Sequence, residues 1–204
     1  MERHAKLTRH DLKHARQYYN SWTPDWARKY LDGARNQVGK CRRFLPHLTG
    51  FDRAYEIGVG PGFLLKLLTD VHGVAIRGCD VGPDEALVFH AMHEELGIAE
   101  LVQVHRVRPR QEIPIVEGSE ALLAFKTFFC ETYTVADYRW LLDHCRERLS
   151  GDKQVILLLN ACCFDVDGVQ AFFMGRAEFP LLDPNISPSQ QHWDNRTFCR
   201  VRLA

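Results

Sequence analysis

The sequence predicts an α/β protein with a doubly wound, mostly parallel sheet and an N-terminal helical extension. From residue 51 onward, apolar segments of strand length alternate with segments of helical periodicity, which is the order that βαβ units produce. One segment, residues 155–159, is wholly apolar, as expected of a central strand covered on both faces. A length of 204 residues suits one such domain and is too short for two ordinary ones. We therefore expect residues 1–50 to form the extension and residues 51–204 the domain.

The extension is predicted to be helical and basic. Thr23-Pro24-Asp25 combines an N-cap residue, a proline suited to the first helical position and an acid in the first turn, so a helix should begin here and run to about Leu45. A shorter amphipathic helix is expected over residues 8–20. Residues 1–50 contain 11 Lys and Arg against 4 Asp and Glu, although the whole chain has zero formal net charge. The extension either docks on its own acidic domain or attracts an anionic substrate.

The elements of the domain follow in a regular order. The sequence predicts strands over residues 53–57, 74–80, 101–107, 121–125 and 155–160, with a turn-rich stretch over 108–118. Helices are predicted between these strands: one over 63–71 that ends at His72-Gly73, one that begins at Gly82-Pro83 and ends at Gly97, and one that begins at the capping box Thr134-x-x-Asp137. A further helix is predicted over 166–174. Residues 197–203 alternate between apolar residues and a face with Arg200 and Arg202. This alternation predicts a half-exposed edge strand.

Cysteine and histidine usage favours a reduced protein without a metal. The seven cysteines have no Cys-x-x-Cys spacing and several lie in apolar runs, which is typical of cytoplasmic thiols. The N-terminus lacks the apolar run of a secretory signal, and no segment has the length of a membrane helix. His90/His93 and His10/His14 are helix neighbours without an evident third ligand. We interpret them as solvated helix faces and expect a cytoplasmic protein.

The turn after the first strand carries the functional signal. It reads Glu56-Ile57-Gly58-Val59-Gly60-Pro61-Gly62, and in an open parallel sheet ligands bind beyond the carboxyl ends of the strands. Glycines allow positive φ and close approach of a ligand to the backbone, although a tight turn without a ligand would also use them. Asp80 ends the second predicted strand, where a carboxylate can accept both hydroxyls of a ribose. Together these residues predict a nucleoside pocket.

The same turn disfavours a dinucleotide. A pyrophosphate site favours Gly-x-Gly-x-x-Gly with no acid near the helix terminus. Here the third glycine comes one residue early, Phe63 occupies its usual place, and Glu56 adds negative charge. These departures argue against a nicotinamide oxidoreductase and suit a ligand with a cationic end.

With these features, residues 51–160 resemble the class I S-adenosylmethionine-dependent methyltransferases, which have a Rossmann-like fold. Residues 56–62 resemble the family's first motif, Cys79-Asp80-Val81 its second, and residues 149–153 the turn before its fifth strand. The resemblance implies S-adenosyl-L-methionine as cofactor. Gly58, Gly60 and Gly62 would pack under its methionine part, Glu56 would orient its amino end, Asp80 would hold the ribose, and Val81 would lie against adenine.

The chain departs from the family in three places. After the third strand, His105-Arg106-Val107 stands where an acid or small polar residue is common, which puts Arg106 at the adenine end. After the fourth strand, where many members of the family have an acidic or Asn-rich motif, residues 124–129 of this chain read Ala-Phe-Lys-Thr-Phe-Phe. Phe125 or Phe128 would be the apolar wall beside the transferred methyl, with the basic Lys126 between them. The family also ends in an antiparallel hairpin, for which residues 178–182 are the candidate partner of residues 197–203.

Methyl transfer is a direct displacement that alignment of the reactants can accelerate without a base. No catalytic base is assigned, because the polar residues that follow the fourth and fifth strands are better explained as loop residues; these are Glu131, Tyr133, Asn160 and Asp165. Tyr18 and Tyr19, near Trp22 and Trp26, either recognise a flat acceptor or pin the extension to the sheet.

The leading hypothesis is therefore methyl transfer to an oxygen or nitrogen of a small-molecule acceptor. The alternative is a methyltransferase-like module that binds a cofactor or partner without turnover. Zero net charge is unlike a dedicated nucleic-acid binder. The sequence does not indicate an oligomeric state.

Overall fold

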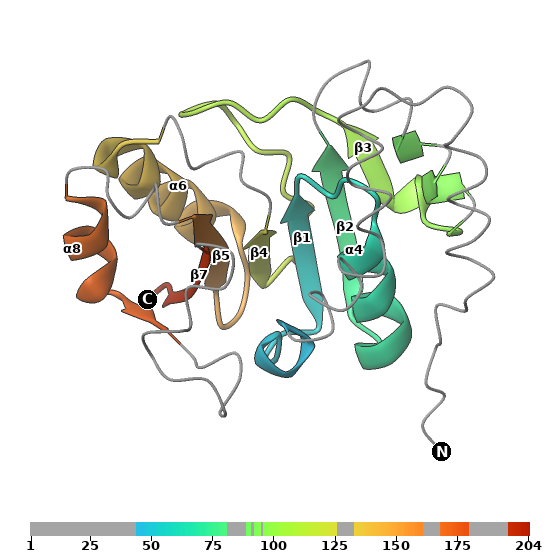
Figure 1. Ribbon diagram of the computed structural model, residues 1–204, viewed down its shortest axis with the longest axis horizontal. Helices are drawn as coiled ribbons and strands as arrows, with labels where there is room; N and C mark the ends of the chain where they lie inside the picture. The colour runs from blue at the N-terminus through green and yellow to red at the C-terminus, as the bar shows by residue number, and fades with distance from the viewer. Residues whose placement is uncertain are drawn as a thin grey trace.

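A computed structural model describes residues 44–80, 89–90, 92–94, 96–125, 133–160, 168–179 and 196–204. In this part of the chain, one seven-stranded sheet has the order β3-β2-β1-β4-β5-β7-β6 (Figure 1). The predicted doubly wound, mostly parallel sheet is confirmed. The helices predicted over residues 8–20 and 24–45 fall almost entirely outside the described residues.

The strands are β1 (Arg53–Ile57), β2 (Ala75–Asp80), β3 (Val102–Val104), β4 (Ala121–Ala124), β5 (Gln154–Asn160), β6 (Ala177–Glu178) and β7 (Arg196–Arg202). Strands β1 to β5 pair in parallel, and β7 is antiparallel to β5 and β6. The chain builds outward from β1 to β3 in one direction and from β4 to β5 in the other. The strand order therefore reverses between β1 and β4, where open α/β sheets bind ligands.

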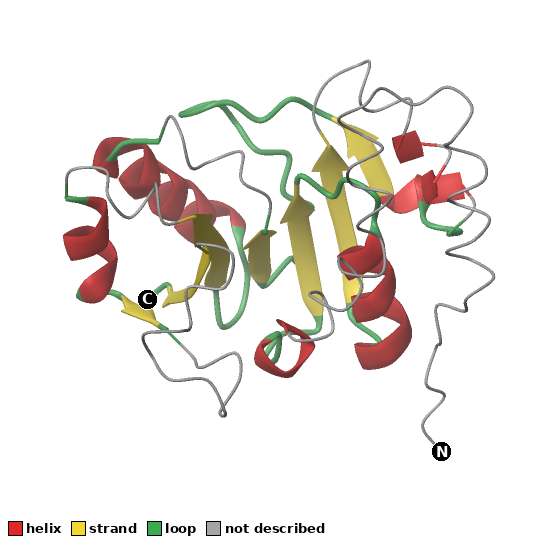
Figure 2. Cartoon of the chain, in the orientation of Figure 1, coloured by secondary structure: helices red, strands yellow, loops and turns green. Residues whose placement is uncertain are grey.

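The helical segments are η1 (Leu45–His47), α4 (Phe63–Leu67), η2 (Leu68–His72), η3 (Ala99–Leu101), α6 (Val135–Arg148) and α8 (Val169–Met174). Figure 2 shows α4 on one side of the sheet and α6 with α8 on the other. Two separate apolar clusters fill these interfaces. In β5, Ile156 and Leu158 belong to the cluster under α4, whereas Val155 and Leu157 belong to the cluster under α6. A central strand buried on both faces explains why this run lacks polar alternation.

The expectation of a half-exposed edge strand over residues 197–203 is wrong. Strand β7 lies between β5 and β6, and Phe198, Cys199 and Val201 are buried. Arg200 is buried as well: its guanidinium donates to the backbone carbonyl of His47 and lies 3.9 Å from the Glu178 carboxylate. Because both partners are distant in sequence, the local pattern around Arg200 predicted that this side chain faces solvent. The antiparallel β6–β7 pair is the terminal hairpin that the family resemblance predicted, with β6 at Ala177–Glu178.

The segment between β3 and β4 covers the α6 side of the sheet without any helix in residues 105–120. Val107 and Ile113 are buried in the α6-side cluster. The predicted turn-rich stretch is confirmed, and β3 is shorter than the predicted 101–107. Arg110 in this segment has a φ of +56°, a left-handed conformation that is strained for a residue with a Cβ.

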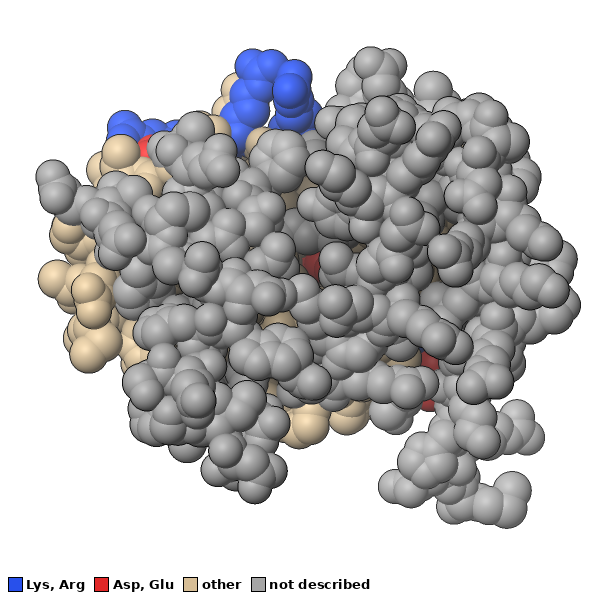
Figure 3. All heavy atoms as spheres, viewed as in Figure 1, with Lys and Arg blue, Asp and Glu red and all other residues tan. Residues whose placement is uncertain are grey.

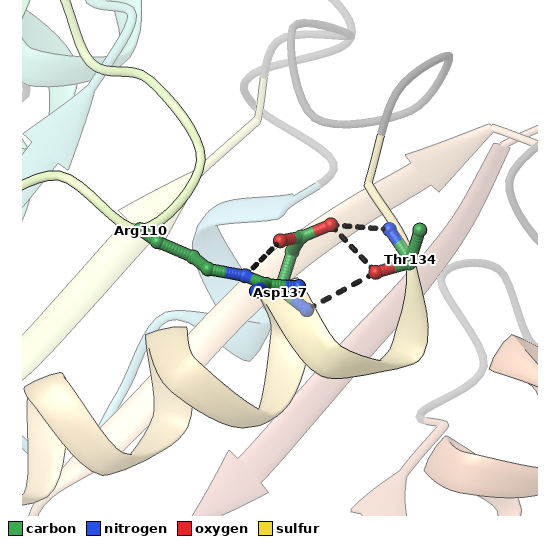
Figure 4. A network of polar contacts seen from close by, with 3 residues as sticks. All are labelled: Arg110, Thr134 and Asp137. Carbon is green, nitrogen blue, oxygen red and sulfur yellow. Dashed lines mark hydrogen bonds and ion pairs between the residues drawn. The ribbon is translucent and has the colours of Figure 1, made fainter.

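An ion pair holds Arg110 against the start of α6 (Figure 4). The predicted capping box is present: Asp137 Oδ2 accepts from Thr134 N at 2.8 Å and from Thr134 Oγ1 at 2.6 Å. Arg110 Nε donates to the other carboxylate oxygen at 2.7 Å. The hydrogen bond from the Thr134 side chain, with smaller contributions from Arg110, lowers the pKa of Asp137 below its ordinary 3.8. The ionised carboxylate therefore ties the loop to the helix.

Asp137→Asn is expected to lower the free energy of unfolding at pH 7 by about 1 kcal/mol, since it weakens a cap. A carboxyl whose pKa is lowered by folding stabilises the protein above pH 3.8 and loses that contribution as the pH falls below it. Urea unfolding at pH 7 and pH 3 should therefore show a smaller acid loss for the variant than for the wild type. Asp143→Asn, at an exposed position of the same helix, should change neither value by more than about 0.5 kcal/mol.

Candidate functional site

The glycine-rich turn lies at the carboxyl ends of β1 and β2. Gly58, Gly60 and Gly62 have φ values of +69°, +52° and +82°, which L-residues with a Cβ rarely adopt. The N–H groups of Gly58 and Val59 donate to the carbonyl of Cys79 at 2.8 and 3.2 Å. Gly62 is the N-cap of α4. The turn is therefore anchored on the end of β2 and leads directly into the helix, beside the point where strand order reverses.

Two buried carboxylates flank this turn on one face of the sheet. Glu56 is 2% exposed and Asp80 is 5% exposed. Glu56 pairs with Gly78 across the β1–β2 ladder, and Asp80 lies two residues beyond Gly78. Because side chains alternate along a strand, Asp80 and Glu56 lie on the same face, which is the face that α4 covers. The predicted acid pair and the predicted glycine turn thus meet at one end of the sheet.

Gly78 is part of this site and was missed by the sequence reasoning. A Cβ at this position would lie 2.4 Å from Val59 Cγ2 and 2.6 Å from the carbonyl oxygen of Glu56. Only a glycine lets the turn and the Glu56 backbone approach β2 so closely. The available signal was a glycine inside a predicted strand, which often marks close approach of another backbone.

His93 is the second residue that was missed, and the expectation that it lies on a solvated helix face is wrong. It is 3% exposed, with Nε2 2.6 Å from the carbonyl oxygen of Gly60. Its neighbour His90 is exposed, as predicted, and lies 3.4 Å from Glu94. Phe89 and Met92 are buried with His93, so the three residues share the helical stripe that packs inward.

Phe125 follows β4 directly and is buried in an aromatic cluster. Its ring centroid lies 5.2 Å from that of Phe44 and 5.9 Å from that of Phe198. Leu123 pairs with Glu56 across the β1–β4 ladder, so Phe125, two residues on, faces the same side of the sheet. The cluster also brings Phe44, from the end of the predicted extension, to this side.

Arg106 lies in the loop after β3 and is exposed. The same loop carries Arg108 and Arg110, which are also exposed. Figure 3 shows Lys and Arg side chains gathered along the edge that this loop follows in Figure 1. Arg106 therefore shares its loop with two other exposed arginines, and its place at the adenine end stays a prediction.

Tyr133, a candidate base, is buried against Tyr138, and burial raises the pKa of its phenol. This environment keeps the phenol protonated and does not favour a base. The remaining candidates lie outside the described residues or have side chains that are not described; they are Tyr18, Tyr19, Val81, Lys126, Phe128, Glu131, Asn160 and Asp165.

Metal and membrane features can be stated for the described residues alone. There, no three His, Cys, Asp or Glu side chains are grouped to hold a metal ion. Over the same residues, no helix combines the length and apolarity needed to span a bilayer. The thiols of Cys79, Cys145 and Cys199 are free and buried, and burial raises the pKa of Cys79 to about 11. These thiols are therefore protonated at neutral pH.

Solved structures share the arrangement described above. The pyocyanin biosynthetic protein PhzM matches with a TM-score of 0.60 and 17% identity over 92% of this chain. Mitomycin 7-O-methyltransferase MmcR matches with 0.56 and 14% over 93%, and the S-adenosylmethionine-dependent methyltransferase SibL with 0.57 and 13% over 85%. This chain has the class I methyltransferase fold.

The similarity is one of fold. No protein-family model matches the sequence, and no curated protein matches it. The chain spans 61% of PhzM, 60% of MmcR and 56% of SibL. The described members of the candidate site are the glycine turn, Glu56, Asp80 and Phe125, which lie at the carboxyl ends of β1, β2 and β4.

Proposed function

We propose that the protein transfers a methyl group from S-adenosyl-L-methionine to an oxygen or nitrogen of a small-molecule acceptor. The observation that carries the proposal is the pair of buried carboxylates, Glu56 and Asp80, on the face of the sheet beside a turn with three positive-φ glycines. The acids suit a ligand with hydroxyls at one end and positive charge at the other. A pyrophosphate ligand would be repelled by the same acids.

The residues of the candidate site have distinct roles in this proposal. Asp80 accepts hydrogen bonds from the two ribose hydroxyls, and Glu56 orients the amino group of the methionine part. The turn from Gly58 to Gly62 packs under that part, since its glycines present backbone without a Cβ. Arg106 borders the adenine end from the loop after β3. Val81 is proposed to contact adenine from outside the described residues.

When bound, S-adenosyl-L-methionine supplies a methyl group activated by attachment to a cationic sulfur. An acceptor lone pair would then form the new bond to the methyl carbon, and the electron pair of the broken carbon–sulfur bond would stay on sulfur. The chain's contribution is alignment and exclusion of water. Phe125, supported by Phe44 and Phe198, provides an apolar wall on the face that holds Glu56. The proton on the acceptor oxygen or nitrogen passes to solvent or to a nearby base.

The acceptor side is proposed to be built by the extension and the segment after β4. Residues 1–50 act as a lid over the domain of residues 51–204, with Tyr18, Tyr19, Lys126 and Phe128 contacting the acceptor. Phe44 supports this arrangement because it packs on Phe125. The name of MmcR, mitomycin 7-O-methyltransferase, supports a small-molecule acceptor, and the name of SibL, an S-adenosylmethionine-dependent methyltransferase, supports the cofactor. Free buried thiols support a cytoplasmic location.

Calorimetry and thermal shift test the proposal directly. S-adenosylhomocysteine at 100 times its dissociation constant should stabilise the protein by about 2.7 kcal/mol, whereas NAD at the same concentration should not shift the melting temperature. Methyl transfer is then followed with isotopically labelled cofactor and pools of phenols, alcohols and amines. Binding without transfer to any pool would favour the module without turnover. A shift with NAD and none with S-adenosylhomocysteine would contradict the proposal.

A further inference from the structure

The glycine turn is held by a side chain from the segment between β2 and β3. We propose that His93 is a positioning residue: its Nε2–H donates to the carbonyl oxygen of Gly60 and fixes the conformation of the turn that receives the cofactor. The inference rests on the proposed function for the identity of that cofactor. It concerns a residue of the protein interior that no cofactor atom needs to touch.

The contact has a defined direction. A backbone carbonyl only accepts hydrogen bonds, so the 2.6 Å separation between His93 Nε2 and Gly60 O requires a proton on Nε2. His93 is 3% exposed, which shields the bond from competition with water. Removing one partner of a buried hydrogen bond leaves the other unsatisfied and is more costly than losing an exposed bond.

The bond supplies a restraint at a position that needs one. Glycine backbones have access to more conformations than other residues, and this turn contains three glycines within five residues. Backbone bonds fix the amides of Gly58 and Val59 on Cys79 O, and the amide of Gly62 on Val59 O. Residue 61 is proline and has no N–H to donate. The His93 bond therefore fixes the peptide that lies between these anchors.

Packing around Gly62 keeps the His93 ring in place. A Cβ on Gly62 would lie 3.2 Å from His93 Cδ2 and 2.3 Å from Ile98 Cδ1, so the turn lies directly against both side chains. The amide of Ile98 donates to the carbonyl of His93 at 2.8 Å. His93, Ile98 and Gly62 thus form one packed unit, in which the histidine contributes a directed donor as well as volume. The consequence is a single backbone surface offered to the methionine part of the cofactor.

Three variants distinguish the loss of the hydrogen-bond donor at His93 from the loss of buried side-chain volume. His93→Leu removes the donor and keeps apolar bulk, His93→Gln keeps an N–H donor, and Met92→Ala removes buried volume from the same helix without touching this bond. Calorimetric titration with S-adenosylhomocysteine should show about tenfold weaker binding for His93→Leu. Binding should return to within about threefold for His93→Gln, and Met92→Ala should bind like the wild type despite a lower melting temperature.

Hydrogen exchange of the ligand-free protein provides a measurement that does not depend on the cofactor. The amides of residues 58–64 should exchange about tenfold faster in His93→Leu than in Met92→Ala, and His93→Gln should restore protection. Equal exchange and equal affinity in His93→Leu and Met92→Ala, or no rescue by glutamine, would overturn the inference. If wild-type protein fails to bind S-adenosylhomocysteine, the proposed function fails, while the exchange rates still decide whether His93 fixes the turn.

Discussion

Asp80→Ala is expected to weaken binding of S-adenosylhomocysteine by about 10- to 100-fold, which is the loss expected when even one hydrogen bond to a charged acceptor, worth about 1.5–3 kcal/mol, is removed. Asp80 ends β2 and is 5% exposed, so its carboxylate would meet the ribose away from bulk water. The backbone carbonyl of Asp80 accepts from His105 N at 3.0 Å, and this bond survives the substitution. The loss should therefore appear in the dissociation constant measured by calorimetry.

The Asp80 prediction can be sharpened with a second ligand. An analogue of S-adenosylhomocysteine that lacks the ribose 2′-hydroxyl should lose less affinity on Asp80→Ala than the parent compound does. The analogue already lacks one of the hydrogen bonds to Asp80, so the substitution cannot remove that bond a second time. Asp70→Ala is the matched control, because Asp70 of η2 is partly exposed and its carboxylate pairs with Lys66 of α4 at 2.9 Å. The dissociation constant of this variant for S-adenosylhomocysteine should stay within about twofold of wild type. Equal losses for the two ligands would place the hydroxyls elsewhere.

The sequence predicted those parts of the fold that local chemistry determines. The strand over residues 53–57 has the observed bounds of β1, and Thr134 with Asp137 forms the predicted capping box. Gly73 ends η2 with a left-handed C-cap, as the predicted stop at His72-Gly73 requires. Glycine turns and caps are set by neighbouring residues, so a single sequence is sufficient to locate them.

The errors fall where distant contacts decide the outcome. Arg200 is buried because His47, 153 residues away, accepts its hydrogen bond. His93 is buried because Gly60, 33 residues away, offers a carbonyl inside the core. Neither partner can be read from the residues around the arginine or the histidine. Each of these two side chains was predicted to face solvent, although the fold supplies it with a buried partner.

Gly78→Ala is expected to lower the free energy of unfolding by about 3 kcal/mol, at the upper end for overpacking a core. The added Cβ would lie 2.6 Å from the carbonyl oxygen of Glu56 and 2.4 Å from Val59 Cγ2. Strand β1 cannot retreat easily, since Glu56 also pairs with Leu123 of β4 on its other side. Relief of the clash must displace the start of the glycine turn. Urea unfolding and calorimetry with S-adenosylhomocysteine should therefore both show a loss.

Two other glycines separate this steric effect from backbone strain. A Cβ on Gly97 or Gly175 meets no atom within 4 Å, but Gly97 has a φ of +67° whereas Gly175 has a φ of −92°. Gly97→Ala should thus cost about 1 kcal/mol of left-handed strain, and Gly175→Ala should change stability by less than about 0.5 kcal/mol. Neither should alter ligand affinity. If Gly78→Ala is no more harmful than Gly97→Ala, or if it leaves affinity unchanged, the close approach of β2 to the Glu56 backbone does not shape the site.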